Sequence, residues 1–490
     1  MHKNLSFAHS KCKFGTLVKL AAATLFLVAL SQIYFLHPAV AQDESTKWTD
    51  PVRLNLYGKT TGTWFVTPAI ATADQYGYVH IFWHEQSDPN VIVYARANGE
   101  GPPKVIDILP SDNGVPITTF IDKQSNLHLS WTTNGMDFSH KMVPVSDALD
   151  ARMWMAAPET APPGAVKPGA DGAWYALSRT LDTAFLAMST DQGRTWSDKR
   201  LLAEADNPGW VLNFDYLVDT TGRIHVVWTS AIKRGVPDGQ KLYYYYSDDH
   251  GLSWSEPVVL DSDDDRYADG YAPWTQKLSL DSKGRIHLIW NGAPAGQRHY
   301  RYTDDRGLTW SNDQQIWSDL RGITGKNNLS EDSRGRLHMI TGSLSWGLYH
   351  AYLENSVWSR PLSIHPDIGD AEGHISLITR GNHLHAIWAN VIETHDVWYA
   401  STRLNTPEIA VAPLPTHIVT RPAQTPTSIA SSPAQGSPTL AAPVTPSRPF
   451  QSSSPPYRKA SQNAPIGVAM IAVIVVMILS VGIHHAINRR

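Results

Sequence analysis

The sequence predicts an all-β chain folded as a seven-bladed β-propeller, and three observations carry this prediction. A motif of the form D-x-x-G-x-[IL]-H-x-x-W recurs roughly every 50 residues, a period typical of propeller blades. Trp (18) and Tyr (19) are frequent, as suits strands, while Gly and Pro (33 each) suit many turns. The segment 48–51 begins W-T-D-P like the expected outermost strands of later units, and the seventh unit lacks such a strand. We therefore expect the N-terminal strand to complete the last blade.

The repeat is clearest at residues 219–228 and 281–290. Weaker copies centre on His80, His128, His338 and His385, and a degenerate copy begins at Asp171. We expect four strands in each unit, with the Asp and Gly of the motif forming the turn between the first two. In the first unit these strands are predicted at 67–72, 78–83, 91–95 and 104–108. Because the histidines occupy equivalent positions in different blades, they cannot converge on one metal, and we expect them to lie inside the blades.

A second motif, S/T-x-D-x-G-x-S/T-W, follows the third expected strand in three consecutive units, at 189–196, 247–254 and 303–310. Its Asp can accept hydrogen bonds from turn amides, its Gly allows a positive φ, and its Trp can pack against the sheet. The residues assigned this structural role are Asp191, Trp196, Asp249, Trp254, Asp305 and Trp310. This motif is the Asp box, and in it the chain resembles the sialidase and BNR-repeat superfamily.

The resemblance implies that the Asp boxes lie on one face of the ring and that a ligand binds on the opposite face. Active sialidases hold the substrate carboxylate with three arginines and use a Tyr–Glu pair as nucleophile and an Asp as acid/base. The first of those arginines usually lies in an R-I-P motif, and this tripeptide does not occur here. The family's rings are also six-bladed. No catalytic residue is therefore carried over by position, and fold likeness alone is a weak basis for activity.

Candidate functional residues are sought where the repeat lengthens, because insertions in repeats usually map to one functional face. The interval between His225 and His287 carries two long loops, 231–241 and 261–277. For an enzyme, we expect Arg266, Arg298 and Arg321 to clamp an anion, Tyr271 to act as nucleophile, and Asp269 or Glu372 to act as acid or helper. Aromatic rings beside charged groups suit sugars. The expected ligand-binding residues are Trp64, Glu85, Trp210, Arg234, Trp274, Lys326, Trp346 and Glu393.

The two ends of the chain predict export and anchoring. The pattern of residues 1–41 predicts a signal peptide, because lysines precede an apolar stretch and A-V-A precedes position 42. The propeller is expected over 42–405, followed by a disordered stalk rich in Pro, Ser and Thr over 406–465. Residues 466–483 carry no charge and as a helix would reach about 27 Å, enough to span a bilayer. Residues 484–490 are the expected cytoplasmic tail, so the propeller would lie outside the cell membrane.

Composition and charge narrow the function classes. Lys+Arg (41) against Asp+Glu (45) leaves a net charge of −4, which gives no basis for binding nucleic acid. The single cysteine, Cys12, excludes disulfides and thiol catalysis in the propeller. We expect no cofactor and assign no metal, although calcium in the acidic run 261–265 is an open alternative. The first hypothesis is a surface-anchored module that binds a glycan or glycoprotein. The alternatives are an exo-sialidase-type glycoside hydrolase and a protein–protein interaction platform.

Overall fold

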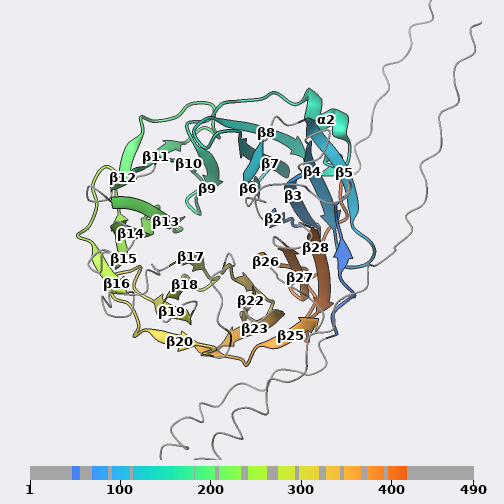
Figure 1. The fold of residues 1–490 in the computed structure, drawn as a ribbon. Helices are drawn as coiled ribbons and strands as arrows, with labels where there is room; N and C mark the ends of the chain where they lie inside the picture. The colour runs from blue at the N-terminus through green and yellow to red at the C-terminus, as the bar shows by residue number, and fades with distance from the viewer. Residues whose placement is uncertain are drawn as a thin grey trace, which may run out of the picture. The chain divides into compact units, whose positions relative to one another are not determined.

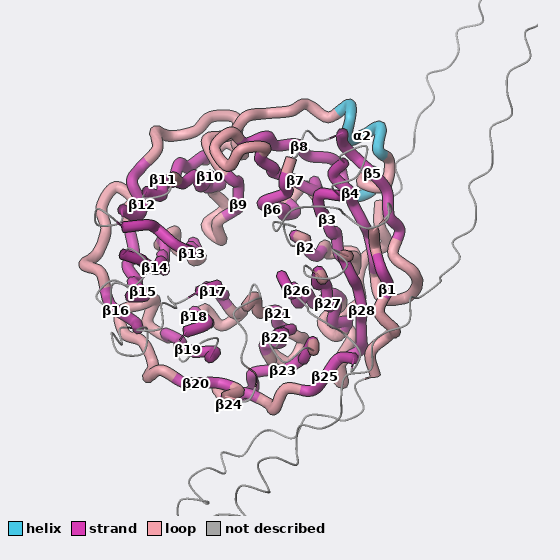
Figure 2. Tube along the Cα trace, in the orientation of Figure 1, coloured by secondary structure: helices cyan, strands magenta, loops and turns pink. Residues whose placement is uncertain are grey.

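Seven antiparallel sheets form a ring in the computed structural model (Figure 1). The structure describes residues 47–55, 69–85, 91–110, 114–180, 183–204, 209–232, 241–261, 274–292, 297–318, 320, 327–342, 347–365, 372–390 and 396–415. In each blade the first strand lies at the centre and the last strand at the rim. Strands dominate the described residues, and α2 (Ala151–Ala156) lies at the rim beside β5 (Figure 2). The predicted seven-bladed all-β propeller is confirmed.

The first four blades consist of strands that follow one another in the chain. Blade 1 contains β2 (Ile70–Ala73), β3 (Val79–Glu85), β4 (Val91–Ala97) and β5 (Lys104–Pro110). Blade 2 contains β6 (Val115–Ile121), β7 (Asn126–Thr132) and β8 (Phe138–Pro144). Blade 3 contains β9 (Ala165–Pro168), β10 (Trp174–Arg179), β11 (Thr183–Ser189) and β12 (Arg200–Glu204). Blade 4 contains β13 (Gly209–Val218), β14 (Ile224–Ile232), β15 (Lys241–Ser247) and β16 (Val258–Asp261).

The remaining three blades complete the ring. Blade 5 contains β17 (Trp274–Leu280), β18 (Ile286–Gly292), β19 (Gln297–Thr303) and β20 (Gln314–Ile316). Blade 6 contains β21 (Ser330–Glu331), β22 (Leu337–Gly342), β23 (Leu348–Glu354), β24 (Val357–Trp358) and β25 (Leu362–His365). Blade 7 contains β26 (Glu372–Thr379), β27 (His383–Ala389), β28 (Val397–Arg403) and, from the other end of the chain, β1 (Val52–Arg53).

The N-terminal strand closes the ring as the sequence predicted. Strand β1 pairs antiparallel with β28, with Val52 opposite Tyr399. The following residue Leu54 is buried in the apolar cluster between blades 1 and 7. The side chain of Asn55 accepts a hydrogen bond from the backbone amide of Val397 at 2.6 Å. Blade 7 is therefore held together by segments more than 300 residues apart in sequence.

Blade 2 departs from the four-strand prediction. Within the continuously described residues 114–180, its sheet has three strands, and one bridge between His140 and Thr160 stands where a fourth would run. The 3₁₀ turn Val145–Asp147 and helix α2 follow β8, and the carboxylate of Asp150 caps the helix. Trp154 of α2 is fully buried against the aromatic rings of blade 1. This tryptophan fills the space between blades 1 and 2 that an outer strand would otherwise cover.

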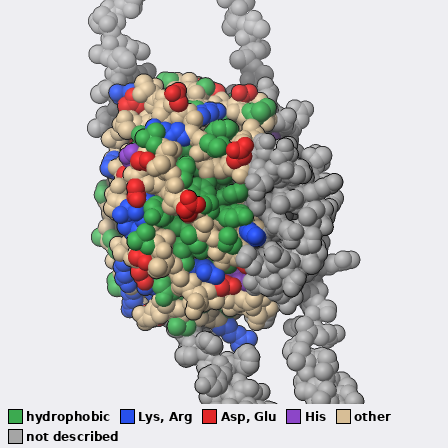
Figure 3. Space-filling model, turned by 90° about the vertical axis from the view of Figure 1, so that its left-hand side faces the viewer, with side chains coloured by type: hydrophobic (Ala, Val, Ile, Leu, Met, Phe, Trp, Pro, Cys, Tyr) green, Lys and Arg blue, Asp and Glu red, His purple; other side chains and the backbone are tan. Residues whose placement is uncertain are grey.

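The core is divided among the blade interfaces. Seven buried apolar clusters occur among the described residues, and each is shared by two neighbouring blades. Burial of this kind supplies the main stabilisation of the ring, at about 25 cal/mol per Å² of apolar surface. Some apolar side chains remain exposed on the outer strands β12 and β16, namely Leu201, Val258 and Val259. The rim view shows hydrophobic side chains gathered among charged ones (Figure 3).

The Asp boxes form the turns between the third and fourth strands of blades 3, 4 and 5, as predicted. In blade 4, Asp249 accepts hydrogen bonds from the amide and hydroxyl of Ser253, and Gly251 has a φ of 84°. The indole of Trp254 donates across the interface to the carbonyl of Leu201 in blade 3, at 3.2 Å. The boxes of blades 3 and 5 repeat the carboxylate contacts. The motif thus fixes a turn and joins neighbouring blades.

The repeated histidines lie inside the blades, each between the turn and the third strand. In blade 4, Nε2 of His225 faces the Asp219 carboxylate at 3.4 Å, and Nδ1 faces the Tyr244 hydroxyl at 2.8 Å. Since burial lowers the pKa of His225, the ring is neutral, donates to the carboxylate and accepts from the phenol. His80 and His287 repeat both contacts in their blades. His128 and His338 also face an aspartate, but a second histidine, His140 or His350, replaces the tyrosine. His385 keeps the tyrosine, Tyr399, and faces the Thr379 hydroxyl in place of an aspartate. In blade 3, Tyr175 stands at this position and donates to Asp171.

The C-terminal part of the described chain runs along the Asp-box face. The amide of Ile409 donates to the carbonyl of Arg380, and the hydroxyl of Ser333 donates to the carbonyl of Pro407. Ser333 lies in the turn between the first two strands of blade 6, and Arg380 lies in the same turn of blade 7. Leu414 then packs against the apolar cluster of blades 1 and 2. We call residues 404–415 the C-terminal strap.

The predicted signal peptide, most of the stalk and the predicted membrane helix lie outside the described residues. The helices of the described residues are all too short or too polar to span a bilayer.

Candidate ligand-binding site

Most of the predicted site residues lie outside the described residues. These are Arg266, Arg321, Tyr271, Asp269, Trp64, Arg234, Lys326, Trp346 and Glu393. Trp210, Trp274 and Glu372 lie on the central strands β13, β17 and β26, and their side chains are outside the description. Their roles stay predictions.

Two predicted site residues are described, and both are buried. Arg298 of β19 is fully buried, and its guanidinium donates to the carbonyls of Leu320 and Gly342, both at 2.6 Å. Burial lowers the pKa of Arg298 to about 10. Glu85 at the end of β3 is also fully buried, beside the indole of Trp83 at 3.4 Å. In this arrangement Arg298 joins blades 5 and 6, and its role as an anion clamp stays a prediction.

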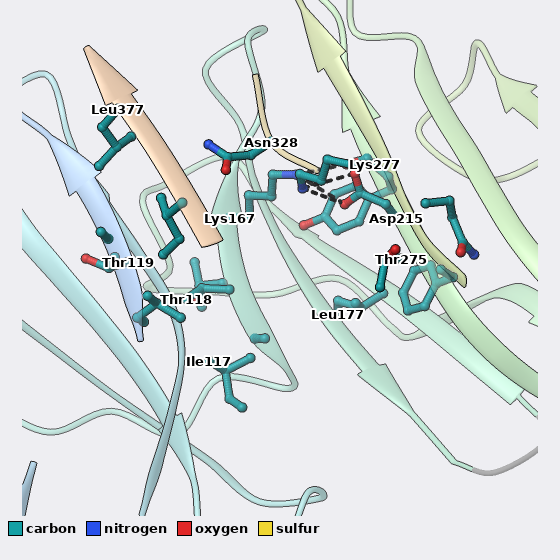
Figure 4. A pocket seen from close by; sticks show the side chains of 18 residues that line it. Ile117, Thr118, Thr119, Lys167, Leu177, Asp215, Thr275, Lys277, Asn328 and Leu377 are labelled. Carbon is teal, nitrogen blue, oxygen red and sulfur yellow. Dashed lines mark hydrogen bonds and ion pairs between the residues drawn. The ribbon is translucent and has the colours of Figure 1, made fainter. Parts of the chain in front are cut away.

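A cavity of about 540 Å³ occupies the centre of the ring. Its walls come from all seven central strands or the residues beside them. The lining is mainly apolar and includes Ile70, Ile117, Phe214, Ile375 and Leu377. Polar groups interrupt it in blades 2 to 6 (Figure 4), and they are Thr118, Thr119, Lys167, Asp215, Thr275, Gln276, Lys277 and Asn328.

The cavity lies towards the face opposite the Asp boxes. In blade 1 its lining comes from Ile70 and Ala71, the first residues of β2, which ends at the turn beginning with Asp74. In blade 5 it likewise comes from Thr275 and its neighbours at the start of β17. In an antiparallel blade, the turn between the first and second strands lies at the same end as the turn between the third and fourth strands. The first strand therefore begins at the other end of the blade, away from the Asp boxes. This is the face on which a ligand was expected.

Each blade contributes one residue at the same level of the cavity. In every blade, we count back from the residue that begins the turn between the first two strands. The residue four positions before it lines the cavity. In chain order these residues are Ile70, Thr118, Ala165, Asp215, Lys277, Asn328 and Ile375. Opposite charges therefore stand side by side in blades 4 and 5. Lys167, two residues along β9 from Ala165, points to the same side because side chains alternate along a strand.

Lys167, Asp215 and Lys277 form a cluster that we call the channel triad (Figure 4). The ammonium of Lys277 lies 3.0 Å from one Asp215 carboxylate oxygen and 3.1 Å from the other. The ammonium of Lys167 lies 3.8 Å from Asp215 and donates to the carbonyl of Tyr216 at 2.9 Å. Asp215 also accepts from the backbone amide of Leu278 at 2.9 Å. The triad therefore joins blades 3, 4 and 5 and carries one net positive charge.

The electrostatics of the channel triad follow from partial burial and close charges. The two lysine side chains remain 35% and 30% exposed, whereas Asp215 is 13% exposed. Burial opposes the charge on Asp215, but the ammonium groups of Lys277 and Lys167 outweigh it and lower the pKa of that carboxyl. Burial, together with repulsion by Lys277, lowers the pKa of Lys167 to about 8. The carboxylate is therefore ionised at neutral pH, and the lysines are the accessible groups.

The lining suits binding of an organic anion more than it suits a cation. Asp215 is the one acidic residue among the described lining residues, and two ammonium groups already neutralise it. No group of three or more His, Cys, Asp or Glu that could hold a metal occurs among the described residues. Tyr216 is no nucleophile either, because its hydroxyl points to the carbonyl of Tyr175 and burial raises the pKa of Tyr216.

The channel triad was missed by sequence reasoning, which looked for site residues in the long loops. A usable signal was present: Lys167, Asp215 and Lys277 are single charged residues within central strands that otherwise carry uncharged side chains. Charges in such positions are costly unless paired. Counting back four residues from each turn would have placed Asp215 and Lys277 at one level of the ring.

Comparison with known proteins identifies the repeat. The BNR/Asp-box repeat family model matches residues 245–256, the Asp box of blade 4. A PL25 ulvan lyase structure covers 71% of this chain and 95% of its own at 12% identity, with a TM-score of 0.47. The intramolecular trans-sialidase from Ruminococcus gnavus covers 73% and 98% at 13% identity, with a TM-score of 0.38. The NanB sialidase from Streptococcus pneumoniae covers 72% and 70% at 12% identity, with a TM-score of 0.38. No curated protein matches the chain.

The Asp-box match and the seven-bladed ring bear out the predicted resemblance in its repeat and its fold: the chain is a seven-bladed propeller that carries a BNR/Asp-box repeat. At these identities and TM-scores, no activity carries over from the solved structures to this chain.

Proposed function

We propose that this propeller binds a glycan in its central cavity and is held at the cell surface by its C-terminal segment. The cavity carries the proposal, because it combines apolar walls with hydroxyl, amide and ammonium groups at one level of the ring. Sugar-binding sites use this combination: apolar surface packs on C–H faces while a few polar groups fix orientation. The volume of about 540 Å³ accommodates a ligand of one to a few sugar rings.

We favour binding of a glycan without turnover over its hydrolysis. Most glycoside hydrolases place two carboxyl groups on either side of the scissile bond, and sialidases use a tyrosine instead of one of them. The described part of the lining offers neither arrangement, since Asp215 is paired and the Tyr216 hydroxyl is turned into the blade. A hydrolase would need its catalytic groups from residues outside the described ones, such as Tyr271 and Asp269.

The experiment that tests this proposal uses the full-length chain in detergent micelles on an array of neutral, uronate-containing, sulfated and sialylated glycans. Ile117→Trp is designed to fill the cavity, because Ile117 lines it and is 37% exposed. We expect at least a tenfold loss of affinity for the best ligand. Met142→Trp is the matched control on β8 of the same blade, at an exposed side chain that does not line the cavity.

Two results would contradict the proposal. Equal binding by the Ile117→Trp and Met142→Trp variants would place the glycan elsewhere, and binding to no glycan would remove the function itself. Incubation with a fluorogenic sialoside separates binding from hydrolysis. Release of the fluorophore that is abolished by Tyr271→Phe would favour a glycoside hydrolase.

The surface location rests on the predicted signal, stalk and membrane helix. Cells that express the full-length chain with one tag inserted after residue 42 and another at the C-terminus provide the test. We expect protease added outside intact cells to cut the propeller away from the C-terminal tag, and protection of the whole chain would contradict this location.

A further inference from the structure

The channel triad contains more positive charge than its fold requires. Asp215 neutralises one lysine, and the carboxylate already receives a short contact from Lys277 and a backbone amide. The ammonium of Lys167 lies 3.8 Å from the carboxylate, donates to the carbonyl of Tyr216 and lies 4.8 Å from the centre of the Tyr216 ring. An ammonium group has three donors, so both lysines have donors to spare.

Mutual repulsion makes the site receptive to a second anion. Two ammonium groups share one carboxylate at the side of a mainly apolar cavity, where charges interact more strongly than in water. An oxyanion placed between the lysines would neutralise the remaining charge and take up the free donors. The lysines are about one third exposed, so a ligand in the cavity can reach them.

The position of the triad separates it from scaffold charges. Buried contacts of aspartates near the Asp-box face recur from blade to blade, as in the aspartate–histidine hydrogen bonds. At the level of the cavity, by contrast, blades 1 and 7 place Ile70 and Ile375 where blades 4 and 5 place opposite charges. Among the described residues that line the cavity, the charged side chains thus lie on one side of the ring.

We propose that Lys167 and Lys277 form an anion subsite that binds a carboxylate or sulfate group of the ligand in the central cavity. This inference rests on the proposed function for the identity of the ligand, whose sugar would then be a uronate or sulfate ester. The apolar wall opposite the triad, with Ile70 and Ile375, would pack against the rest of the sugar. Asp215 acts as a positioning residue that holds the two ammonium groups in place.

The first test measures binding of inorganic sulfate to the full-length chain by isothermal titration at low ionic strength and neutral pH. We expect Lys277→Met, and separately Lys167→Met, to weaken sulfate binding at least tenfold. Methionine keeps most of the side-chain volume, and the remaining Lys–Asp pair is neutral, so both variants should fold. Lys104→Met removes an exposed lysine of blade 1 as the matched control and should leave the affinity unchanged.

The second arm uses a glucuronate-containing, a sulfated and a neutral oligosaccharide of equal length. We expect preference for the two acidic ligands, and loss of this preference in the Lys167→Met/Lys277→Met double variant. If neutral and acidic glycans bind equally well and the variants change nothing, the anion subsite is wrong while glycan binding stands. If sulfate binds at the lysines and no glycan does, the subsite stands and the proposed function is wrong. Absence of sulfate binding in the unaltered chain would overturn the subsite.

Discussion

The end of the ring that carries the Asp boxes and the level of the central cavity use charged residues in opposite ways. At the Asp-box end, buried aspartates and histidines recur in blades 1, 4, 5 and 6 and hydrogen-bond to each other within one blade. At the cavity, three charged residues occur in adjacent blades, and their partners lie in neighbouring blades. A residue that recurs in most blades serves the fold of the blade. A charge that breaks the repeat has no such explanation and points to a ligand.

The largest expected effect is that of acid on the repeated histidines. Burial lowers the pKa of His80, His128, His225, His338 and His385, whereas an unfolded chain would bind a proton near pH 6.5. The unfolded state therefore takes up more protons as pH falls below 6.5, and stability decreases. Each neutral histidine contributes roughly 1.4 kcal/mol per pH unit to this loss. Urea unfolding at several pH values between 7.5 and 4.5 measures it.

The paired aspartates add to the loss at lower pH. Their pKa values are depressed despite burial, because the histidines and turn amides hydrogen-bond to the charged form; the affected residues are Asp122, Asp219, Asp281 and Asp332. This contribution is present above about pH 4 and is lost as pH falls further. His225→Gln serves as the control, and it should reduce proton uptake on unfolding at pH 5.5 by about one. A pH-independent unfolding midpoint between 7.5 and 4.5 would show that these histidines are not buried and neutral.

The second prediction concerns closure of the ring. Deleting residues 43–57 removes β1, leaves the edge of β28 unpaired and exposes the site of Leu54. Loss of one buried leucine alone costs about 2–5 kcal/mol, so we expect a sharp fall in melting temperature, measured by calorimetry. Deletion of the segment after residue 415 is the control and should leave the transition in place. An unchanged melting temperature for the first deletion would mean that β1 does not seal the ring.

The third prediction sets a buried aspartate against an exposed one in the same blade. Asp219 accepts from His225 and from Arg306 of blade 5, at 3.4 and 2.8 Å, whereas Asp248 pairs with Arg223 and is 57% exposed. Asp219→Asn replaces the buried, charged acceptor of these hydrogen bonds with a neutral amide and should cost about 2 kcal/mol. Asp248→Asn should cost less than about 1 kcal/mol. Denaturant unfolding of both variants gives the two values, and equal costs would remove the distinction between scaffold and surface charges.

The smallest expected effect on stability is at the channel triad. Lys277→Met and Lys167→Met each leave a neutral pair, so we expect changes within about 1 kcal/mol. The pH dependence of sulfate binding distinguishes the channel triad from the buried histidines. Because the pKa of Lys167 is lowered to about 8, sulfate binding should weaken as pH rises from 7 to 9, while Asp215 stays ionised. Titrations at both pH values measure this, and stronger binding at pH 9 would exclude Lys167 as a donor.

How much could be predicted from the sequence depends on whether a feature repeats. The seven units, the Asp-box turns and the closing strand were predictable because each leaves a pattern that recurs, including the W-[ST]-x-P start of outer strands. The helix in blade 2 was not predictable, because α2 with its buried Trp154 takes the place of a fourth strand while the spacing of the repeat stays the same. The cavity residues were also missed, because which side of a short central strand faces the axis depends on its register with the neighbouring strand.

The C-terminal strap and the central cavity occupy different ends of the ring. Residues 404–415 are bound along the Asp-box face through Arg380 and Ser333, and none of them lines the cavity. A molecule that enters the cavity therefore does not compete with the strap for space, and a change in the strap leaves the wall of the cavity intact.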